Sequence, residues 1–262
     1  MAASRSLLLV LVAYHPSQQE VDHLKINLQT LSPEVGYSVV VNDHQPGEPV
    51  DQLLGDADLW LVNTENLGYG RAVNRLVRSL EVLPAYLGIL NTDLSWDQNT
   101  FSLLLGWLQV HPDVVLAVPQ IVDKHGMVQK LCKQNPTVLG LLSRRFIPRW
   151  VKPNWLRRYD NWYVMHSENY QQVFEAPYLS GCCMLIRSES FQNVGGFDER
   201  YFLYLEDADL TRKLVSLGRC IHLPQASIVH GWGRGNYASW RLTLVNLHSA
   251  WLYFCKWGWR LW

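Results

Sequence analysis

The 262-residue chain lacks an excess of charge of either sign. Its 23 lysine and arginine residues are matched by 23 aspartate and glutamate residues, so the formal net charge is zero. Broad binding of nucleic acid needs a strongly basic surface, and the neutral balance therefore argues against nucleic acid as a partner. With 48% apolar and 18% charged residues, the composition is that of a globular protein. The length suits one large α/β domain or two small ones.

The sequence also lacks a disulfide framework, a zinc motif and a membrane-spanning run. Its five cysteines are odd in number, include the neighbours Cys182 and Cys183, and form no Cys-x-x-Cys pair. We therefore expect buried free thiols in a reducing compartment. No apolar stretch reaches the ~18 residues that a membrane helix needs. Arg5 and the apolar run at 7–13 are similar to a short signal peptide, but no small-x-small cleavage site follows, and we expect a cytoplasmic protein.

Hydrophobic periodicity predicts alternating strands and helices in the first part of the chain. Helical spacing of apolar residues begins near Ser17, Gly70 and Thr100, and Ser17 has capping-box spacing to Glu20. Strand-length apolar runs separate these helices and occur at 7–13, 37–41, 58–62, 86–90 and 114–118. The alternation predicts a mostly parallel, doubly wound α/β sheet.

The later part of the chain is less regular. Residues 120–175 show no clear period, whereas 178–186 and 220–223 are predicted to form strands. Between them, a helix is expected to begin near Glu206 and to end at Gly218.

Acidic residues are absent from the C-terminal part of the chain. After Asp209 there is no carboxylate side chain, although seven lysine or arginine residues follow, and six of the twelve tryptophans lie at 232–262. The stretch 144–158 is also free of acids, and its six basic residues are interleaved with Trp150 and Trp155. Such segments are typical of a membrane surface or an anionic partner. A helix that packs its aromatic side chains onto the domain is an equally good interpretation.

Polar residues follow three of the predicted strands. They are Tyr14-His15, Asn42-Asp43 and Asn91-Thr92-Asp93. Ligands of doubly wound sheets bind beyond the carboxyl ends of the strands, so these clusters define a candidate site. A carboxylate such as Asp93 can hold Mg²⁺ or Mn²⁺ there when phosphate oxygens and waters complete the coordination. The same triplet also suits a plain turn.

Three acids within four residues open the helix predicted near Glu206. Carboxylates in a first helical turn are favoured by about 0.3–1 kcal/mol each, and Asp209 can pair with Arg212 or Lys213. The three acids nevertheless repel one another, which is better tolerated where one faces a cation or a reacting hydroxyl. Asp207, kept ionised by the helix dipole, has the charge state that a general base requires.

Two further features permit either a structural or a functional interpretation. His230 lies between an apolar pair and a glycine-rich turn, where it could close over a bound phosphate or metal, although a lone histidine is more often structural. Gly68-Tyr69-Gly70 precedes a helix without the dinucleotide or Walker pattern. Arg71 and Asn74 could contact a nucleotide diphosphate there, and a plain turn with a helix cap is equally possible.

The order of these motifs is similar to that of a known enzyme family. The segments in question are Leu7–Pro16, Asn66–Asn74, Leu90–Asp93, Leu179–Arg187, Gly195–Glu199 and Phe202–Leu210. Their order resembles that of the family 2 glycosyltransferases with the GT-A fold, especially the bacterial rhamnosyltransferase branch. The resemblance covers residues 5 to about 232. It implies a GT-A domain at 1–232, with a nucleotide-binding half at about 1–119 and an acceptor-binding half at about 120–232, followed by a helical extension at 233–262.

The resemblance implies an inverting, metal-dependent transfer of a sugar from a nucleotide diphosphate. Asp207 would be the catalytic base with Glu206 as its neighbour, and Asp93 would be the acid of a D-x-D-type motif that binds Mg²⁺ or Mn²⁺. His230 matches a late histidine that often helps to hold the metal or diphosphate. The nucleotide sugar would contact the residues at the other strand ends: Tyr14, Asn42, Asp43, Arg71 and Asn91.

The sequence departs from the family pattern at three of these positions. Asn91 replaces the first acid of D-x-D, so the metal would depend more on the phosphates of the donor. Asn42-Asp43 reverses the usual Asp-Asn order, which leaves open which residue touches the nucleotide. His15 stands where asparagine is commoner.

On this basis we expect a rhamnosyltransferase that uses dTDP-rhamnose. Its acceptor would be a growing cell-surface glycan or a lipid-diphosphate-linked sugar, as in O-antigen or polysaccharide biosynthesis, at the cytoplasmic face of the inner membrane. Alternatives are another donor, such as UDP-galactofuranose or UDP-GlcNAc, and a catalytically silent binding module. Asp93, Asp207 and His230 together argue against the silent module. A nucleotidyltransferase would carry a glycine-rich loop with a basic residue near the N-terminus, and residues 14–17 lack one.

Overall fold

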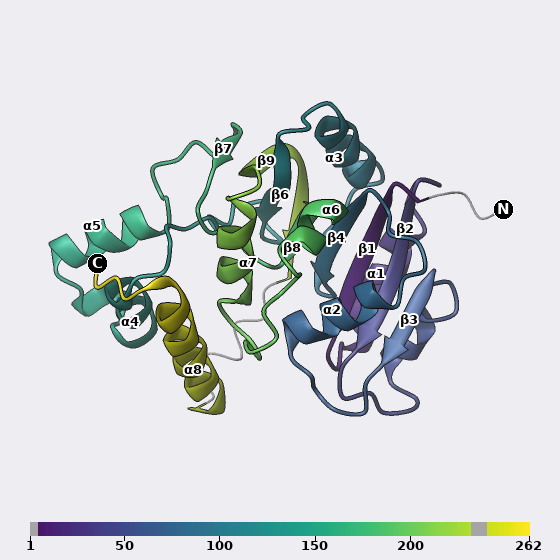
Figure 1. Cartoon of the computed structure of the whole chain (residues 1–262), viewed down its shortest axis with the longest axis horizontal. Helices are drawn as coiled ribbons and strands as arrows, with labels where there is room; N and C mark the ends of the chain where they lie inside the picture. Colours follow the sequence, from purple (N-terminus) through teal and green to yellow (C-terminus); the bar gives the residue numbers. More distant parts are fainter. Residues whose placement is uncertain (1–4, 232–239) are drawn as a thin grey trace.

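A computed structural model describes residues 5–231 and 240–262 of the chain. A nine-stranded sheet with the order β3-β2-β1-β4-β8-β6-β9-β5 forms its centre, and β7 also pairs with β9 (Figure 1). The strands are β1 (Leu7–Ala13), β2 (Val35–Val41), β3 (Leu59–Val62), β4 (Tyr86–Asn91), β5 (Leu94–Trp96), β6 (Val114–Val122), β7 (Phe174–Glu175), β8 (Cys183–Arg187) and β9 (Arg219–His230). The helices are α1 (Gln18–Leu28), α2 (Tyr69–Arg78), α3 (Thr100–Gln109), α4 (Val138–Phe146), α5 (Asn154–Tyr163), α6 (Ser188–Asn193), α7 (Glu206–Leu214) and α8 (Trp240–Trp257), with the 3-10 helices η1 (Pro49–Leu53) and η2 (Arg149–Val151).

The predicted α/β class and mostly parallel sheet are confirmed. Strands β1, β2, β3, β4, β6 and β9 run in one direction, while β5, β7 and β8 run against their neighbours. The carboxyl ends of the six parallel strands therefore reach the same edge of the sheet, and the chain enters β8 from that edge. This edge is where ligands of doubly wound sheets bind.

Helices cover both faces of the sheet, which explains why β1 is apolar at every position. Leu7, Leu9 and Leu11 belong to the core under α1 and α3, whereas Leu8 and Val10 belong to the core under α2 and α7. The first helix begins as predicted, because the Ser17 side chain accepts the Glu20 N–H and Glu20 accepts the Ser17 N–H.

Two predicted strands differ from the structure in extent. The strand expected at 178–186 begins only at Cys183, because the chain turns at Gly181 and Tyr178 pairs with Lys133 in an isolated bridge. The strand expected at 220–223 extends to His230, because β9 pairs first with β6 and then with β5.

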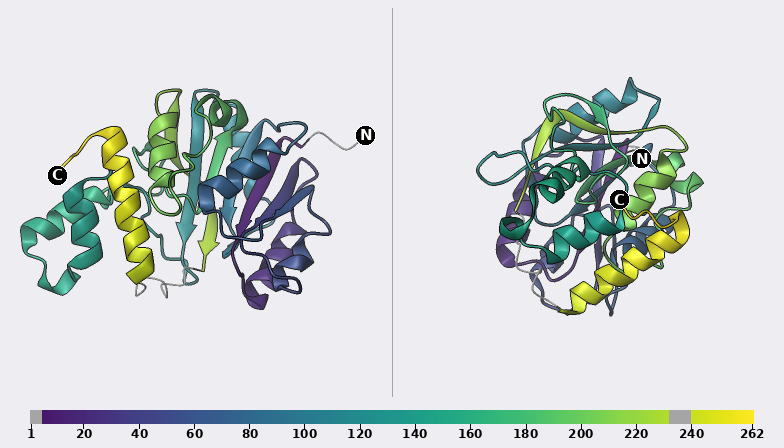
Figure 2. Two further views of the ribbon diagram at one scale, coloured as in Figure 1. Left: turned by 60° about the horizontal axis from the view of Figure 1, so that its bottom comes forward. Right: turned by 90° about the vertical axis from the view of Figure 1, so that its left-hand side faces the viewer.

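The region 120–175, which shows no clear sequence period, contains two helices of its own. Helices α4 and α5 lie beside α8 at the end of the molecule opposite β1–β3 (Figures 1 and 2). The sheet is continuous across the proposed boundary at residue 119, since β6 spans it and β9 pairs with β6. The division into donor and acceptor halves stays a prediction, and the boundary at 232/233 lies outside the described residues.

Helix α8 packs part of its aromatic surface onto the domain, and the membrane-surface interpretation of the Trp-rich C-terminus stays a prediction. Tyr253 and Phe254 are buried against the domain, whereas Trp240 and Trp251 are exposed. Its Cys255 is exposed as well, which corrects the expectation of buried thiols; the other four cysteines are free and buried. No helix within the described ranges is long and apolar enough to cross a membrane.

A fully buried carboxylate attaches α8 to α7. Asp209 accepts hydrogen bonds from the Lys256 ammonium at 2.9 Å and from the Trp257 indole at 2.7 Å, and its side chain is 0% exposed. The sequence predicts Arg212 or Lys213 as its partner, and Lys213 lies at 3.9 Å. The dominant partners are instead 47 and 48 residues away along the chain.

We expect Asp209→Ala to lower the free energy of unfolding by about 1–3 kcal/mol, because it leaves the Trp257 indole N–H without its acceptor, whereas Lys256 keeps its hydrogen bond of 2.9 Å to Asp198. Urea denaturation followed by circular dichroism measures this change. Asp58→Ala, which removes a half-exposed ion pair with Arg5, is the control and should cost less than about 1 kcal/mol. Equal losses in the two variants would contradict the proposed attachment.

Candidate active site

Strands β4 and β9 bring Asp93 and His230 together. Asp93 lies in the tight turn between β4 and β5, and its Oδ2 is 3.2 Å from His230 Nε2 at the end of β9. The turn is fixed to β9 by the pairing of Leu94 with His230 and by the Gly231 N–H, which donates to the Asp93 carbonyl at 2.9 Å. Two residues 137 positions apart thus form one polar pair at the ligand-binding edge.

The first turn of α7 places Asp207 at the same edge. Its Oδ2 accepts the Gly181 N–H and its Oδ1 accepts the Ala208 N–H, both at 2.9 Å. Gly181 leads into β8, so this bond fixes the start of α7 beside the sheet. Each oxygen keeps a second lone pair that can accept a proton. The carboxylate is partly exposed and thus accessible to a substrate.

A strained backbone segment leads into Asp207. Tyr204 and Leu205 both have positive φ angles, of 70° and 65°, which bulky side chains rarely adopt. The backbone of Gly68 packs against Phe202, which lies two residues before Tyr204. Gly68 has a φ of 85°, and a Cβ added to it would lie 2.4 Å from the Phe202 carbonyl oxygen. Strain of this kind concentrates at functional sites.

Cys182 lies within electrostatic reach of both acidic groups. Burial raises the pKa of its thiol to about 11, and the charges of Asp93 and Asp207 add to that rise. The Asn91 N–H donates to the Cys182 carbonyl at 3.0 Å, which fixes the end of β4 next to the start of β8. The residues predicted as metal ligand and base therefore share one site.

Glu206 is buried beside Asp207. Only 7% of its surface is exposed, and within the described ranges its Oε2 has no hydrogen-bond partner. Burial, together with the charge of Asp207, raises the pKa of Glu206 to about 8. Glu206 is therefore protonated at neutral pH, and the geometry favours Asp207 as the group that accepts a proton.

The sequence analysis did not single out Lys133. Its ammonium lies 4.2 Å from the centre of the Tyr178 ring, and the two residues exchange backbone hydrogen bonds. Burial lowers the pKa of Lys133, whereas the charge of Asp207 favours its protonated form. Nothing in the local sequence marks this lysine, because a bridge between residues 45 positions apart places it beside the base.

The ends of β1 and β2 form a second group of polar residues. His15, with a φ of 45°, lies between Glu48 Oε1 at 2.5 Å and Asp43 Oδ2 at 3.2 Å. These two hydrogen bonds, first the one to Glu48, raise the pKa of His15. The exposed Tyr14 ring lies against the His15 imidazole with its centre at 4.5 Å.

Asn42 and Asp43 differ in their surroundings. Asn42 is 2% exposed, donates to the Gly68 carbonyl at 3.3 Å and accepts from Asn63 at 3.0 Å. The Asp43 side chain is 42% exposed. The geometry therefore favours Asp43 as the member of the pair that contacts a ligand, while Asn42 holds the Gly68 turn.

Arg71 lies at the start of α2 with an exposed side chain. Its Nε is 3.5 Å from Glu199 Oε2, and Arg78 pairs with the same carboxylate. Asn74 faces inward, because it donates to the Phe197 carbonyl at 2.8 Å. The roles proposed for Arg71, and for the other residues in contact with the donor, stay predictions.

Few side chains at the sheet edge could act as metal ligands. Among residues 5–231 and 240–262, no group of three or more histidine, cysteine or acidic side chains could enclose a metal ion. Asp93 and His230 supply one carboxylate and one imidazole, which suit a divalent ion whose remaining ligands are phosphate oxygens and waters. The residues present therefore fit a metal that binds together with a diphosphate.

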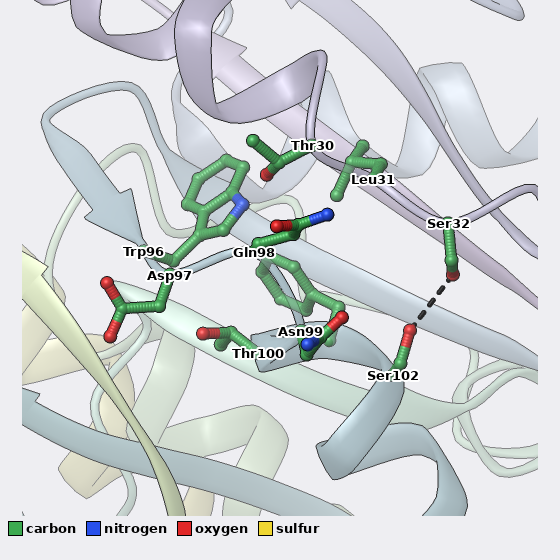
Figure 3. A pocket seen from close by; sticks show the side chains of 10 residues that line it. Thr30, Leu31, Ser32, Trp96, Asp97, Gln98, Asn99, Thr100 and Ser102 are labelled. Carbon is green, nitrogen blue, oxygen red and sulfur yellow. Dashed lines mark hydrogen bonds between the residues drawn. The ribbon is translucent and has the colours of Figure 1, made fainter.

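The small pocket between α1 and α3 is unrelated to this site. It contains the hydrogen bond of 3.0 Å between Ser32 and Ser102, and none of the candidate residues lines it (Figure 3). Its volume of about 10 Å³ is enough for about one water molecule.

Comparisons with known proteins identify relatives of the chain and of its fold. No family model matches the chain. The chain is 30% identical over 269 aligned residues to the N-acetylglucosaminyl-diphospho-decaprenol L-rhamnosyltransferase of two Mycobacterium tuberculosis strains. The alignment covers 92% of this chain and 85% of that enzyme.

Solved structures share the fold at low sequence identity. GalNAc-T7 with UDP, GalNAc and Mn²⁺ superposes with a TM-score of 0.68 at 13% identity, over 97% of this chain and 48% of that one. The mannosyltransferase PcManGT from Pyrobaculum calidifontis, with GDP-Man and Mn²⁺, gives 0.60 at 16% identity, over 90% and 60%. TarS from S. aureus gives 0.56 at 15%, over 86% and 60%. The chain thus spans only about half to three fifths of these structures.

The chain has the GT-A fold of these structures, and its similarity to the mycobacterial enzyme shows that it is a glycosyltransferase. The predicted resemblance is confirmed. More specifically, the chain belongs to the family that includes the mycobacterial rhamnosyltransferase, since the two sequences are 30% identical over nearly their whole lengths.

The buried Glu206 predicts a pH dependence of stability. Its pKa is about 8 in the folded protein and near its ordinary value of 4.5 when unfolded, so unfolding releases a proton between these two values. The free energy of unfolding should therefore fall as pH rises from about 5 to 8, by at most about 1.4 kcal/mol per unit from this group. Glu206→Gln should remove this slope, so the variant gains stability relative to wild type up to pH 8. Urea denaturation from pH 5 to 9 tests this, and parallel curves would show that Glu206 is ionised when folded.

Proposed function

We propose that this glycosyltransferase transfers L-rhamnose from dTDP-rhamnose, with inversion, to a sugar carried on a lipid diphosphate. The relative from Mycobacterium tuberculosis, whose name describes this kind of acceptor and product, supports the choice of sugar and acceptor. The same fold can use another donor, such as UDP-galactofuranose or UDP-GlcNAc. A panel of nucleotide sugars, read by thermal shift and donor hydrolysis, separates these donors.

The observation that carries the proposal is the position of Asp207. Two backbone N–H groups fix its carboxylate, which stays partly exposed at the edge where Asp93 and His230 also lie. A base held in this way can reach a hydroxyl of a sugar bound over the sheet edge. The retained acid, base and imidazole are not needed by a silent binding module.

The reaction is a single displacement at the anomeric carbon of the donor. The acceptor hydroxyl oxygen forms the new bond to this carbon as the bond to the diphosphate oxygen breaks, and Asp207 takes the hydroxyl proton. Attack from the face opposite the leaving group inverts the configuration. Positioned base catalysis of this kind contributes about 10²–10⁴-fold to the rate.

A divalent metal fits the Asp93–His230 pair. Asp93 would hold Mg²⁺ or Mn²⁺ with His230, and Asn91 would contribute no charge. When bound, the metal would neutralise the charge of the departing diphosphate. The Mn²⁺ in the GalNAc-T7 and PcManGT complexes supports a divalent ion for this fold.

The nucleotide part of the donor would lie along the ends of β1 and β2. The exposed Tyr14 ring offers a face for the base, and the exposed Asp43 carboxylate offers acceptor oxygens for a ribose hydroxyl. Arg71, which faces only Glu199 at 3.5 Å, would contact the phosphates. Asn42 would position this surface from behind.

The acceptor would reach the enzyme at a membrane surface. Fourteen of the 24 exposed large apolar side chains in the described ranges lie at 138–163 and 240–262, interleaved with exposed arginines. The acid of this region, Asp160, is neutralised by Lys152. Aromatic and basic side chains together favour an interface of anionic lipids.

Asp207→Asn should lower kcat by about 10²–10⁴-fold while the affinity for the donor is kept, because asparagine preserves the size of the side chain but accepts no proton. Asp93→Ala should have the complementary effect and remove the metal-dependent part of donor binding. Turnover assays and calorimetric titration of the nucleotide with and without Mn²⁺ measure both. Full activity of Asp207→Asn would assign the base elsewhere, most simply to Glu206.

Replacing Trp150 and Trp155 by serine should reduce several-fold the fraction of protein that floats with phosphatidylglycerol vesicles, because both rings are exposed on the basic face. Added salt should weaken the remaining binding. The matched control is Trp60→Ser, which removes an exposed ring from β3 at the other end of the molecule. Equal flotation of all three proteins would refute the membrane-surface assignment.

A further inference from the structure

An apolar pocket lies between α4 and α8, on the side of the molecule away from β1–β3 (Figure 1). Its volume is about 220 Å³. The side chains that form it include Leu141 and Leu142 from α4, Leu247 and Trp251 from α8, and Trp259 from the C-terminal tail. We call this cavity the α4–α8 pocket.

The C-terminal tail closes one end of the α4–α8 pocket. The carbonyls of Arg260 and Leu261 accept hydrogen bonds from the N–H groups of Val138 and Leu139 at 2.9 and 3.0 Å, which satisfies the free amides at the start of α4. Trp259 stacks on Phe254 with ring centres 5.1 Å apart. The pocket is thus enclosed by the two helices and by residues 259–261.

One hydrophobic cluster connects the α4–α8 pocket with the active site. Phe254, which lines the pocket, belongs to the same buried cluster as Tyr178 and Ala208. Ala208 follows Asp207, the proposed base. The Lys133 ammonium lies 4.2 Å from the centre of the Tyr178 ring. The pocket therefore lies close behind the acceptor side of the active site.

Lys133 has no acidic partner that would compete with a ligand. Within residues 5–231 and 240–262 it forms no ion pair, and the charge that most favours its protonated form is that of Asp207. A desolvated ammonium interacts more strongly with an anion than one in water. Arg144, on α4, is exposed and adds a second positive charge near Lys133.

We propose that Lys133 binds the diphosphate of the lipid acceptor and that the α4–α8 pocket binds the part of the apolar chain next to it. The proposal rests on the proposed function, since it takes a lipid diphosphate as the acceptor. The charge of the pocket wall supports this occupant. Among the described residues that line the pocket, Arg145 is positively charged and none is acidic.

The size of the pocket limits what it holds. Pockets for whole drug-sized ligands measure about 300–1,000 Å³, so a pocket of 220 Å³ encloses only a short segment of a chain. The remainder of the chain would pass along the exposed rings of α5 and α8 into the bilayer. The apolar chain and the sugar are attached to opposite ends of the diphosphate. Enclosing the first segment of the chain would therefore help to align the sugar hydroxyl with Asp207.

The test uses farnesyl diphosphate, farnesol and pyrophosphate as probes, each below the concentration at which it forms micelles, with calorimetric titration of the full chain. Leu247→Arg places a charge in the pocket wall, whereas Leu244→Arg, on the same helix and similarly exposed but outside the pocket, is the matched control. We expect Leu247→Arg to weaken farnesyl diphosphate and farnesol at least 10-fold and Leu244→Arg to change neither. Lys133→Met should weaken farnesyl diphosphate and pyrophosphate at least 10-fold and leave farnesol unchanged.

Equal affinities of Leu247→Arg and Leu244→Arg for farnesyl diphosphate, or no binding of it by wild type, would overturn the proposal. Loss of flotation with plain phospholipid vesicles in Leu247→Arg, without loss of farnesyl diphosphate binding, would assign the pocket to bilayer lipids instead. The probes carry no sugar, so their binding is independent of glycosyl transfer. A wild type that binds farnesyl diphosphate but transfers no rhamnose would refute the proposed function and leave this site in place.

Discussion

Three carboxyl groups in the first turn of α7 repel one another, and the fold gives each a different environment. Glu206 is buried and keeps its proton at neutral pH. Asp209 is buried too, but Lys256 and Trp257 bind it. Asp207 alone is partly exposed and is held by backbone amides. Neutralising the two neighbours in different ways leaves a single free carboxylate, which is the condition for a defined general base.

This arrangement links α8 to the helix turn that carries Asp207, although α8 lies outside the sheet. The buried Asp209 side chain accepts hydrogen bonds from an ammonium and an indole N–H of α8, and removal of one partner from such a buried pair is costly. The turn that carries Asp207 is thus fixed on one side by Gly181 and on the other by α8. The same helix forms a wall of the α4–α8 pocket. In the proposed function, positioning of the base and contact with the apolar chain would therefore depend on one element.

Much of this fold can be predicted from the sequence, because its local patterns are strong. Apolar runs of strand length and the Ser17–Glu20 capping box place β1 and α1 correctly. The rule that ligands bind at the carboxyl ends of parallel strands then collects Asp93 and His230 at one edge. Their 3.2 Å contact agrees with that expectation, although their role toward a metal stays a prediction.

The features that escape the sequence depend on contacts between distant segments. The local sequence around Lys133 does not mark it as a site residue. Only its bridge to Tyr178 brings it toward the candidate site. The sequence does not show which of Asn42 and Asp43 would contact a ligand. The structure distinguishes them, because Asn42 is buried and the Asp43 side chain is partly exposed at the end of β2. Helices α4 and α5 carry exposed aromatic residues and polar residues that blur the helical period, so the region at 120–175 has no clear pattern.

The zero net charge conceals a separation of charge that matters for the two substrates. Residues 210–262 contain seven basic and no acidic side chains, so every carboxylate of the chain precedes α7 or lies in its first turn. The proposed donor surface carries the carboxylates of Asp43 and Asp93, whereas the end with α4, α5 and α8 carries exposed cations and aromatic rings. Because charges separated by more than about 8–10 Å are largely screened at physiological salt, each substrate responds to its local surface and not to the net charge. The exposed aromatic rings beside these cations provide an apolar contact that would suit the proposed lipid acceptor.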